Sequence, residues 1–132
     1  IKLTVVSALV LGFSGCANST AATAYSSGDF RTAKSLWEKD CNDGGENGCY
    51  NLALMYQMGE GMAANEQKAQ EIYKKACDLG SKRACFNSGV LYSRGSLNKI
   101  KVDKIKMLWK KACSMGHSKA CQGLDKIKEK GY

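Results

Sequence analysis

The chain has 132 residues, of which 44% are hydrophobic and 24% are charged, and it carries a formal charge of +8. This is the composition of an ordinary globular protein, and the length predicts about one domain. The lysines are spread along the chain apart from a run near 99–111, and no nucleic-acid-binding motif accompanies them. We therefore interpret the charge as the solvated face of helices and expect no nucleic-acid partner.

The first sixteen residues have the pattern of an export signal. Residues 3–13 are apolar, behind Lys2, but the stretch is shorter than the roughly 20 residues that span a bilayer, and it suits the core of a secretory signal. The following Phe13-Ser14-Gly15-Cys16 resembles the lipobox of bacterial lipoproteins, in which the cysteine is lipidated. We expect residues 1–16 to form a signal and lipobox segment, with membrane contact only through a lipid anchor at Cys16.

Ordinary cleavage further along is the alternative, because Ala22-Thr23-Ala24 fits the small-x-small rule for signal peptidases. Both routes predict an exported protein, either a periplasmic or outer-membrane lipoprotein or a secreted one. Both also take Cys16 out of the folded domain, which we place at residues 17–132 and which holds the other six cysteines.

The remainder of the chain repeats with a period of 36 residues. The blocks LWEKDC (36–41), IYKKAC (72–77) and LWKKAC (108–113) align, and NDGGENGC, DLGSKRAC and SMGHSKAC follow them. A fixed period of this length indicates a solenoid or another repeat array. We therefore expect about three repeats within residues 17–132.

Each repeat has the pattern of a pair of helices. Apolar residues recur at helical spacing, as in Ala69, Ile72, Tyr73 and Ala76. The helical stretches end at glycines, which adopt the left-handed conformation that often closes a helix; these are Gly59, Gly80, Gly95 and Gly116. One pair cannot bury its apolar face alone, so the pattern predicts an all-α fold, a right-handed α/α solenoid of stacked helix pairs.

Two kinds of residue should determine how closely the helices pack. The large residues Trp37, Tyr73 and Trp109 share one repeat position and are expected to fill the space between helices. Small residues should allow the helices to approach closely, and they are Ala53, Ala69, Ala76, Ala84, Ala112 and Ala120.

The six remaining cysteines form three pairs with a separation of eight residues. A short turn at Gly80 would bring Cys77 and Cys85 face to face, and a disulfide needs Cα atoms roughly 4.4–6.8 Å apart. Six cysteines allow many pairings, but the repeat favours Cys41–Cys49, Cys77–Cys85 and Cys113–Cys121. Zinc sites and redox motifs use shorter spacings. We therefore expect disulfide staples, no metal site and no cofactor.

The motif Asn51-Leu52-Ala53-x-x-Tyr56-x-x-Gly59-x-Gly61, followed by Ala69-x-x-x-Tyr73-x-Lys75-Ala76, resembles the Sel1-like repeat, a relative of the tetratricopeptide repeat. With its paired cysteines and secretory start, the chain is similar to the cysteine-rich Sel1-like proteins of Helicobacter and Campylobacter relatives. In the last repeat Gly123 and Lys128 replace the Asn and Tyr of that motif, which fits the polar cap of an array.

That family is commonly labelled as β-lactamase, so the resemblance implies penicillin binding and weak hydrolysis of the β-lactam amide. Serine β-lactamases use Ser-x-x-Lys at a helix start together with Ser-Asp-Asn and Lys-Thr-Gly. The one match, Ser96-Leu97-Asn98-Lys99, falls between repeats and lacks both partner motifs. With a single histidine, neither a triad nor a metal-dependent site can be assembled. No catalytic constellation is found in the sequence.

A binding scaffold is the function that the residues favour, with the β-lactam hydrolase as the alternative. Asn51 and Asn87 lie one repeat apart on helices expected to line the concave surface, where they could bind a peptide backbone or an amide. The alternative is that they bond their own helix or turn. The expected partner is a protein or peptide, with peptidoglycan or a β-lactam as the further candidates.

Overall fold

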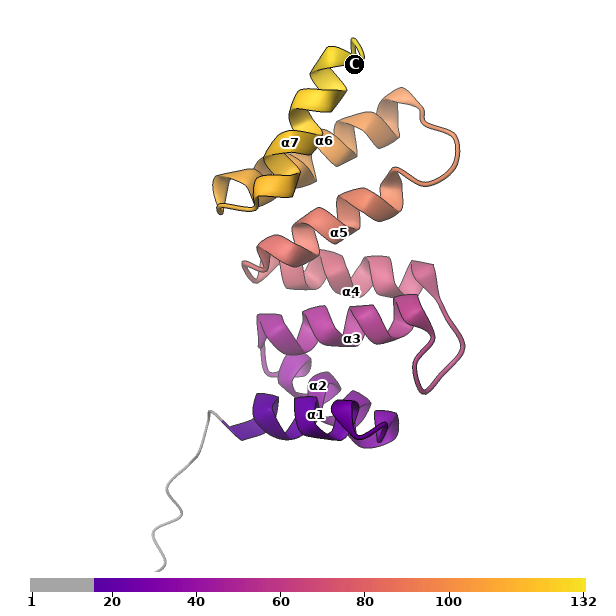
Figure 1. Cartoon of the computed structure of the whole chain (residues 1–132), viewed down its shortest axis with the longest axis vertical. Helices are drawn as coiled ribbons and strands as arrows, with labels where there is room; N and C mark the ends of the chain where they lie inside the picture. The colour runs from indigo at the N-terminus through magenta and orange to yellow at the C-terminus, as the bar shows by residue number, and fades with distance from the viewer. Residues whose placement is uncertain (1–15) are drawn as a thin grey trace, which may run out of the picture.

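The computed structural model of the protein describes residues 16–132 (Figure 1). This part of the chain contains helices and no strand, which confirms the predicted all-α fold. The helices are α1 (Cys16–Ser26), α2 (Phe30–Asn42), α3 (Glu46–Met58), α4 (Glu66–Asp78), α5 (Lys82–Tyr92), α6 (Lys99–Ser114) and α7 (Ser118–Glu129). The leader predicted for residues 1–16 lies outside the described residues, apart from Cys16 at the start of α1.

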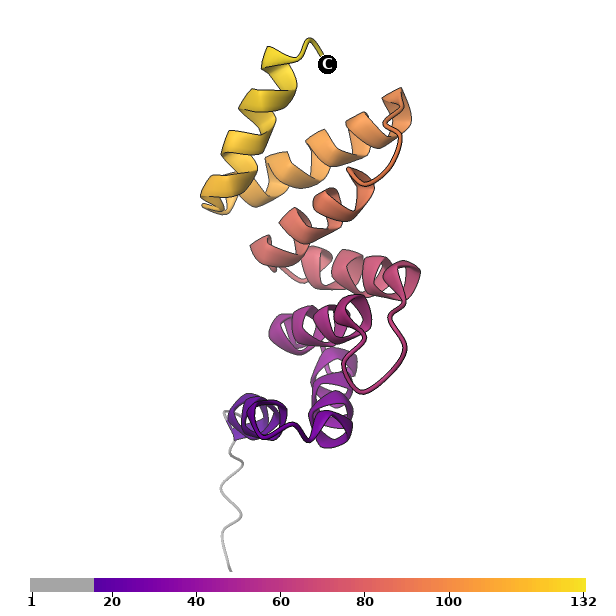
Figure 2. The same ribbon diagram turned by 45° about the vertical axis from the view of Figure 1, so that its right-hand side comes forward.

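The helices stack in chain order, from α1 at one end to α7 at the other (Figures 1 and 2). The extensive helix–helix contacts all join elements that are adjacent in the sequence. This nearest-neighbour packing is the property of a solenoid, in which each repeat is stabilised by the next. None of the described helices is long and apolar enough to cross a membrane.

The helix ends follow the signals in the sequence. Asn65 and Asn98 accept hydrogen bonds from the backbone N–H three residues later, at 2.9 Å in each case, and so cap α4 and α6. Gly59 closes α3 with a φ of 72°, and Gly80 follows α4 with a φ of 105°. Both values lie in the left-handed region that favours glycine, as the repeat pattern predicts.

The core includes the small residues and the repeated aromatic position, together with aliphatic side chains such as Leu52, Met55 and Ile72. Trp37 is 5% exposed, Tyr73 is fully buried and Trp109 is partly buried. The small residues predicted at helix contacts are all 0% exposed, namely Ala53, Ala69, Ala76, Ala84, Ala112 and Ala120. The spacing of large and small residues therefore predicts the packing correctly.

The three predicted disulfides are present, and each joins a helix to the next one across a short turn. Their Cα–Cα distances are 4.4 Å for Cys41–Cys49, 4.7 Å for Cys77–Cys85 and 4.9 Å for Cys113–Cys121. These distances lie within the range that a disulfide requires. The staples therefore fix the pairs α2–α3, α4–α5 and α6–α7.

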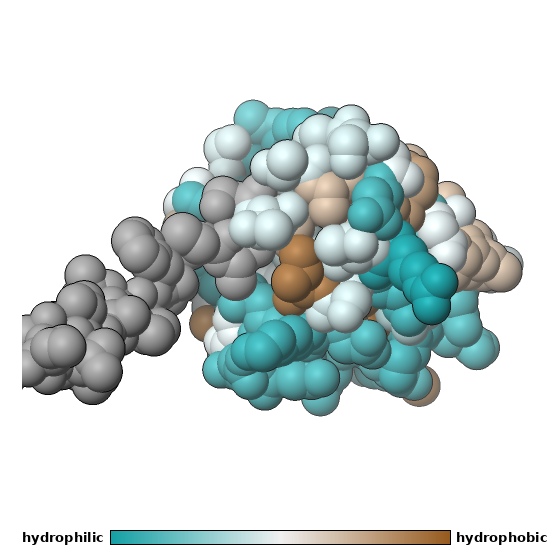
Figure 3. All heavy atoms as spheres, turned by 90° about the horizontal axis from the view of Figure 1, so that it is seen from below, coloured by the Kyte–Doolittle hydropathy of each residue, from teal (hydrophilic) through white to brown (hydrophobic). Residues whose placement is uncertain are grey.

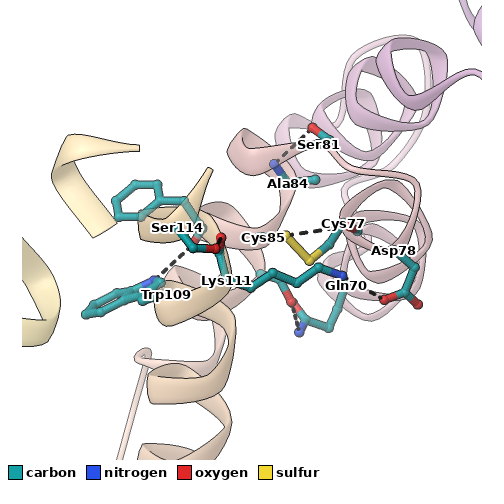
Figure 4. Close-up of a disulfide and its surroundings, with 11 residues drawn as sticks. Gln70, Cys77, Asp78, Ser81, Ala84, Cys85, Trp109, Lys111 and Ser114 are labelled. Carbon is teal, nitrogen blue, oxygen red and sulfur yellow. Dashed lines mark hydrogen bonds and ion pairs between the residues drawn. A yellow bond between two sulfur atoms is a disulfide. The ribbon is translucent and has the colours of Figure 1, made fainter. Parts of the chain in front are cut away.

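Polar contacts connect the central stapled pair to α6 (Figure 4). Trp109 Nε1 donates a hydrogen bond to the carbonyl of Phe86 at 3.1 Å. Lys111 Nζ lies 3.6 Å from a carboxylate oxygen of Asp78. Both contacts reach across a repeat boundary, so they help to set the angle at which the last pair leaves the stack.

Candidate functional site

The side of the stack formed by α1, α3, α5 and α7, which we call the odd-helix face, contains a pocket near its first end. This first pocket lies between α1 and α3, with Trp37 of α2 in its lining, and has a volume of about 260 Å³. Its lining residues are Ala22, Tyr25, Ser26, Trp37, Asn51 and Leu54. Seen from the end that carries α1, the surface is mainly hydrophilic and is interrupted by small apolar areas (Figure 3).

The first pocket contains two polar groups that make no hydrogen bond within residues 16–132. The indole Nε1 of Trp37 is buried and has no hydrogen-bond partner in this part of the chain. The half-buried amide of Asn51 makes no hydrogen bond with another described residue. Most buried polar groups in proteins are paired, so this combination is uncommon. Asn51 therefore lies where the sequence predicts a binding residue, with its donor and its acceptor both available.

Aromatic contacts hold one wall of the first pocket in place. The Tyr25 ring lies 5.3 Å from the rings of both Phe30 and Trp37, measured between centroids. The Tyr25 hydroxyl donates a hydrogen bond to Glu60 Oε2 at 2.6 Å. This bond to a carboxylate, followed by burial, raises the pKa of Tyr25, so the phenol stays neutral at ordinary pH.

Asn87, the second predicted binding residue, has a different environment. Its Nδ2 donates to the hydroxyl of Tyr73 at 3.3 Å, and that hydroxyl donates to Gln57 Oε1 at 2.6 Å. Burial raises the pKa of Tyr73 to about 12, so the hydroxyl keeps the proton that it donates. The network joins α3, α4 and α5 to one another. Asn87 is therefore engaged in packing between helices, and only Asn51 faces a pocket.

A second pocket occurs at the equivalent repeat position near the other end of the odd-helix face. It lies between the loop after α5, α6 and α7, and has a volume of about 230 Å³. Its lining residues are Ser93, Leu97, Val102, Ile105, Trp109, Gly123, Lys126, Ile127, Lys130 and Tyr132. Four of them lie 72 residues, or two repeats, after residues of the first pocket: Leu97, Trp109, Gly123 and Lys126 correspond to Tyr25, Trp37, Asn51 and Leu54.

The structure gives a packing reason for Gly123, one of the two residues that the sequence assigned to a polar cap. A Cβ atom at position 123 would lie 2.6 Å from Cε3 of Trp109, which is closer than real Cβ contacts. A Cβ at Gly89 would meet the same indole from α5. The indole thus packs between two glycines. Lys128, the other residue, is exposed as a capping residue should be.

The serine–lysine motif of the hydrolase hypothesis does not form a site in the structure. Ser96 lies in the loop before α6, Lys99 is the first residue of that helix, and both side chains are exposed. The contact between Ser96 and a lysine is through its carbonyl oxygen, which accepts from Lys101 Nζ at 3.0 Å. Within residues 16–132, no group of three His, Cys, Asp or Glu side chains could hold a metal ion.

The equivalence of the two pockets is the feature that sequence reasoning missed. The signal was present in the sequence, because each aromatic residue of the repeat is followed fourteen residues later by the residue that packs beside it. These pairs are Trp37 with Asn51, Tyr73 with Asn87, and Trp109 with Gly123. The two pockets lie beside the first and third of these residue pairs. In the second pair, a hydrogen bond joins Asn87 to Tyr73.

Comparison with known proteins gives a consistent result. A family model described as the Sel1 repeat matches residues 47–81 and 82–117. The fold is similar to the crystal structure of a protective antigen present in uropathogenic Escherichia coli strains, which displays an SLR fold, with 29% sequence identity and a TM-score of 0.69. The alignment covers 76% of this chain but 21% of that one, so the chain spans about a fifth of its length. No curated protein matches.

Proposed function

The chain belongs to the Sel1 repeat family, and from this premise we propose that it is a protein-interaction scaffold that binds an extended segment of a partner along the odd-helix face. Repeat arrays of this kind present long surfaces suited to extended ligands. The first pocket would take one side chain of the segment, and Asn51 would bind its backbone.

The available amide of Asn51 is the observation that carries this proposal. An asparagine side chain offers both a donor and an acceptor, which match the carbonyl and the N–H of a peptide bond. The pocket beside it is walled by Tyr25, Trp37 and Leu54, which are apolar enough to receive a partner's side chain. Asn87 is a natural comparison, because its amide already bonds Tyr73.

We also propose that the scaffold works outside the cytoplasm, in the cell envelope or beyond it. Three disulfides in a chain of this size suit an oxidising compartment. The apolar segment before Cys16 supports the same proposal. Signal cleavage after Ala24 would remove Ala21, which is fully buried in the core, so processing at Cys16 suits the fold better.

Peptide selection against the purified protein would test the binding proposal. We expect selected peptides to lose about fivefold to tenfold in affinity with Asn51→Ala, which removes one or two hydrogen bonds. We expect Leu54→Glu to abolish binding, because it places a charge in the pocket. Asn47→Ala is the matched control, since Asn47 is exposed on the same helix and does not line the pocket. Peptides that bind all three variants equally would contradict the proposal.

Two further measurements address the compartment and the chemistry. The intact mass of the exported protein should lie six hydrogens below that of the reduced chain, with a lipid mass added if Cys16 is acylated. Incubation with a penicillin should leave the drug intact. Turnover that Ser96→Ala or Asn87→Ala abolishes in a folded variant would instead favour the β-lactam hydrolase.

A further inference from the structure

We propose that the second pocket, together with the lysines around it, binds an acidic peptide segment that carries one large apolar side chain. This inference goes beyond the proposed function, because it assigns a partner chemistry to a separate pocket. It would stand even if the first pocket bound nothing. Its support is the distribution of charge, the pairing of the lysines and the shape of the pocket.

Nearly all of the net charge of the protein lies in its last quarter. Residues 99–132 contain ten lysines and three carboxylates, which gives +7, whereas residues 1–98 contain ten basic and nine acidic residues, which gives +1. Residues at matching repeat positions differ in charge between the two parts of the chain. Glu38 corresponds to Lys110, and Leu54 of the first pocket corresponds to Lys126 of the second. A concentrated charge of one sign attracts and orients a partner of the opposite sign.

Most of these lysines form no ion pair with a described residue. Among the described residues, only two of the ten form ion pairs: Lys111 with Asp78 at 3.6 Å and Lys128 with Asp125 at 3.9 Å. Lys126, at the second pocket, forms none. The positive field around α6 and α7 is therefore largely uncompensated within this part of the chain, and carboxylates of a partner would meet little competition.

The second pocket is an apolar recess with basic residues at its edge. Val102 and Ile105 are 5% and 2% exposed and form its base. Leu97 and Tyr132 are 46% and 58% exposed, so apolar surface continues outward from the recess. Lys126 and Lys130 also line the pocket and are exposed.

An adjoining cavity extends this surface. It has a volume of about 370 Å³ and shares Leu97, Val102 and Tyr132 with the second pocket. It adds Lys99, Lys106 and one carboxylate, Asp103, to the lining. The two cavities together form a short groove in which apolar residues lie inside and four lysines outnumber the single carboxylate along the edges. That arrangement matches a segment with one buried apolar residue and carboxylates on either side of it.

The shape of the site favours a peptide over the other polyanions that a basic surface could attract. A bilayer would need the exposed apolar side chains to share one face, but Ile100 and Met107, 69% and 64% exposed, lie outside the groove. Single-stranded nucleic acid is typically held by successive aromatic side chains on which bases stack. The groove offers a single exposed aromatic residue, Tyr132.

Fluorescence anisotropy with a labelled synthetic peptide tests the inference directly. The probe is a short peptide of glutamate and aspartate around one central phenylalanine, and its partner peptide carries serine in place of the phenylalanine. We expect the serine peptide to bind at least tenfold more weakly, because burying a phenylalanine contributes about 1.5–3 kcal/mol. We also expect affinity to fall as salt is added, because exposed charges are screened.

Charge-reversal variants then locate the site. Lys126→Glu combined with Lys130→Glu should weaken binding of the phenylalanine peptide about tenfold or more, because each substitution replaces an attraction with a repulsion. Lys119→Glu is the matched control, since Lys119 is exposed on the same helix but does not line the groove, and it should change affinity less than about twofold. Circular dichroism checks that all variants remain helical.

Three outcomes would overturn the inference. The first is equal binding of the phenylalanine and serine peptides, and the second is an equal loss with the control variant. The third is stronger competition by phosphatidylglycerol vesicles or a single-stranded DNA oligonucleotide than by unlabelled peptide. The variant Leu54→Glu separates this inference from the proposed function. It blocks the first pocket and should leave binding of the acidic peptide unchanged.

Discussion

The two ends of the odd-helix face have the same helix arrangement, but their pockets differ in charge and in hydrogen bonding. Trp37 and Trp109 occupy the same repeat position and each lines a pocket. The indole N–H of Trp37 is buried and has no partner among the described residues, whereas that of Trp109 donates to the carbonyl of Phe86. The first pocket has no charged lining residue, and the second is edged by Lys126 and Lys130.

This difference shows how a repeat protein can vary its binding sites without changing its backbone fold. The backbone, the disulfides and the aromatic position recur every 36 residues. Two positions of the next helix account for part of the difference between the pockets, and they hold Asn51 and Leu54 at one end and Gly123 and Lys126 at the other. Substitutions that exchange the features of the two ends should therefore test the comparison.

The largest expected effect comes from removing the staples at the two ends. Each disulfide closes a loop of about nine residues, which contributes about 2.5 kcal/mol by restricting the unfolded chain. Cys41 and Cys49 are 3% and 0% exposed, whereas Cys113 and Cys121 are only partly buried. Replacing the first pair by alanine should therefore lower the free energy of unfolding by about 1 kcal/mol more than replacing the last pair, because it also leaves a cavity.

Urea unfolding followed by circular dichroism measures both losses in the oxidised proteins. The control is the variant that lacks both disulfides. Its loss in the free energy of unfolding should equal the sum of the two separate losses, because the staples lie at opposite ends. An equal loss from the two single-staple variants would mean that burial of the sulfur atoms adds nothing to the effect of closing the loop.

The second prediction exchanges the residues beside the two tryptophans. Gly123→Asn should destabilise the protein by about 1–3 kcal/mol, because the side chain would overlap the Trp109 ring. The reverse change, Asn51→Gly, should cost only about 0.5 kcal/mol, the difference in helix propensity. Both values come from thermal or urea unfolding.

A second substitution makes this prediction specific. The protein already contains a working combination of Asn with Tyr at this position, since Asn87 donates to the Tyr73 hydroxyl. Trp109→Tyr should therefore restore at least half of the stability lost in Gly123→Asn. If the double variant is less stable than either single one, then the overlap with the ring is not the cause of the loss.

The third prediction concerns the two indole N–H groups. Trp→Phe removes the same atoms at either end, but at position 109 it also leaves the Phe86 carbonyl without its donor. We expect Trp109→Phe to cost up to about 1 kcal/mol more than Trp37→Phe, because Trp109 loses a hydrogen bond that Trp37 does not make, an effect offset in part by the deeper burial of Trp37. The reverse order in urea unfolding would mean that the deeper burial of Trp37 outweighs the hydrogen bond of Trp109.

The sequence predicts the helix pairs and the disulfides well, because a strict repeat places equivalent residues at equivalent positions in each pair. The period places the cysteines of each pair on either side of one short turn, so three pairings follow from one, and the structure confirms all three. The aromatic and alanine positions are buried for the same reason. Each inference uses only the spacing between residues, and a solenoid preserves that spacing from one repeat to the next.

The sites are harder to predict because they depend on what a residue faces. Asn51 and Asn87 are the same residue at the same repeat position, so the repeat pattern predicts the same binding role for both. Their environments differ because Tyr73 has a hydroxyl that can accept a hydrogen bond and Trp37 has none. The charge of the second pocket was obscured in a similar way, since a total of +8 does not reveal that +7 of it lies in residues 99–132.

The smallest expected effect comes from the residue that begins α7. The residues before α3, α5 and α7 share a repeat position and are Gly45, Ser81 and His117. The His117 side chain accepts a hydrogen bond from the N–H of Ala120 at 3.3 Å through Nδ1, so it caps the helix only in its neutral form. Burial, together with the positive charges of Lys82 and Lys119, lowers the pKa of His117 from 6.5.

Because the folded pKa lies below the unfolded value, the unfolded chain binds more protons, and the stability contributed by His117 increases with pH. It is fully present above about pH 6.5 and is lost as the pH falls below that value. Urea midpoints measured on both sides of that value should therefore shift slightly downward in acid. His117→Ser reproduces the cap of α5 and should remove the shift. A shift that persists in this variant would have to come from carboxylates elsewhere in the stack, and the two helix starts would then be equivalent in their response to pH.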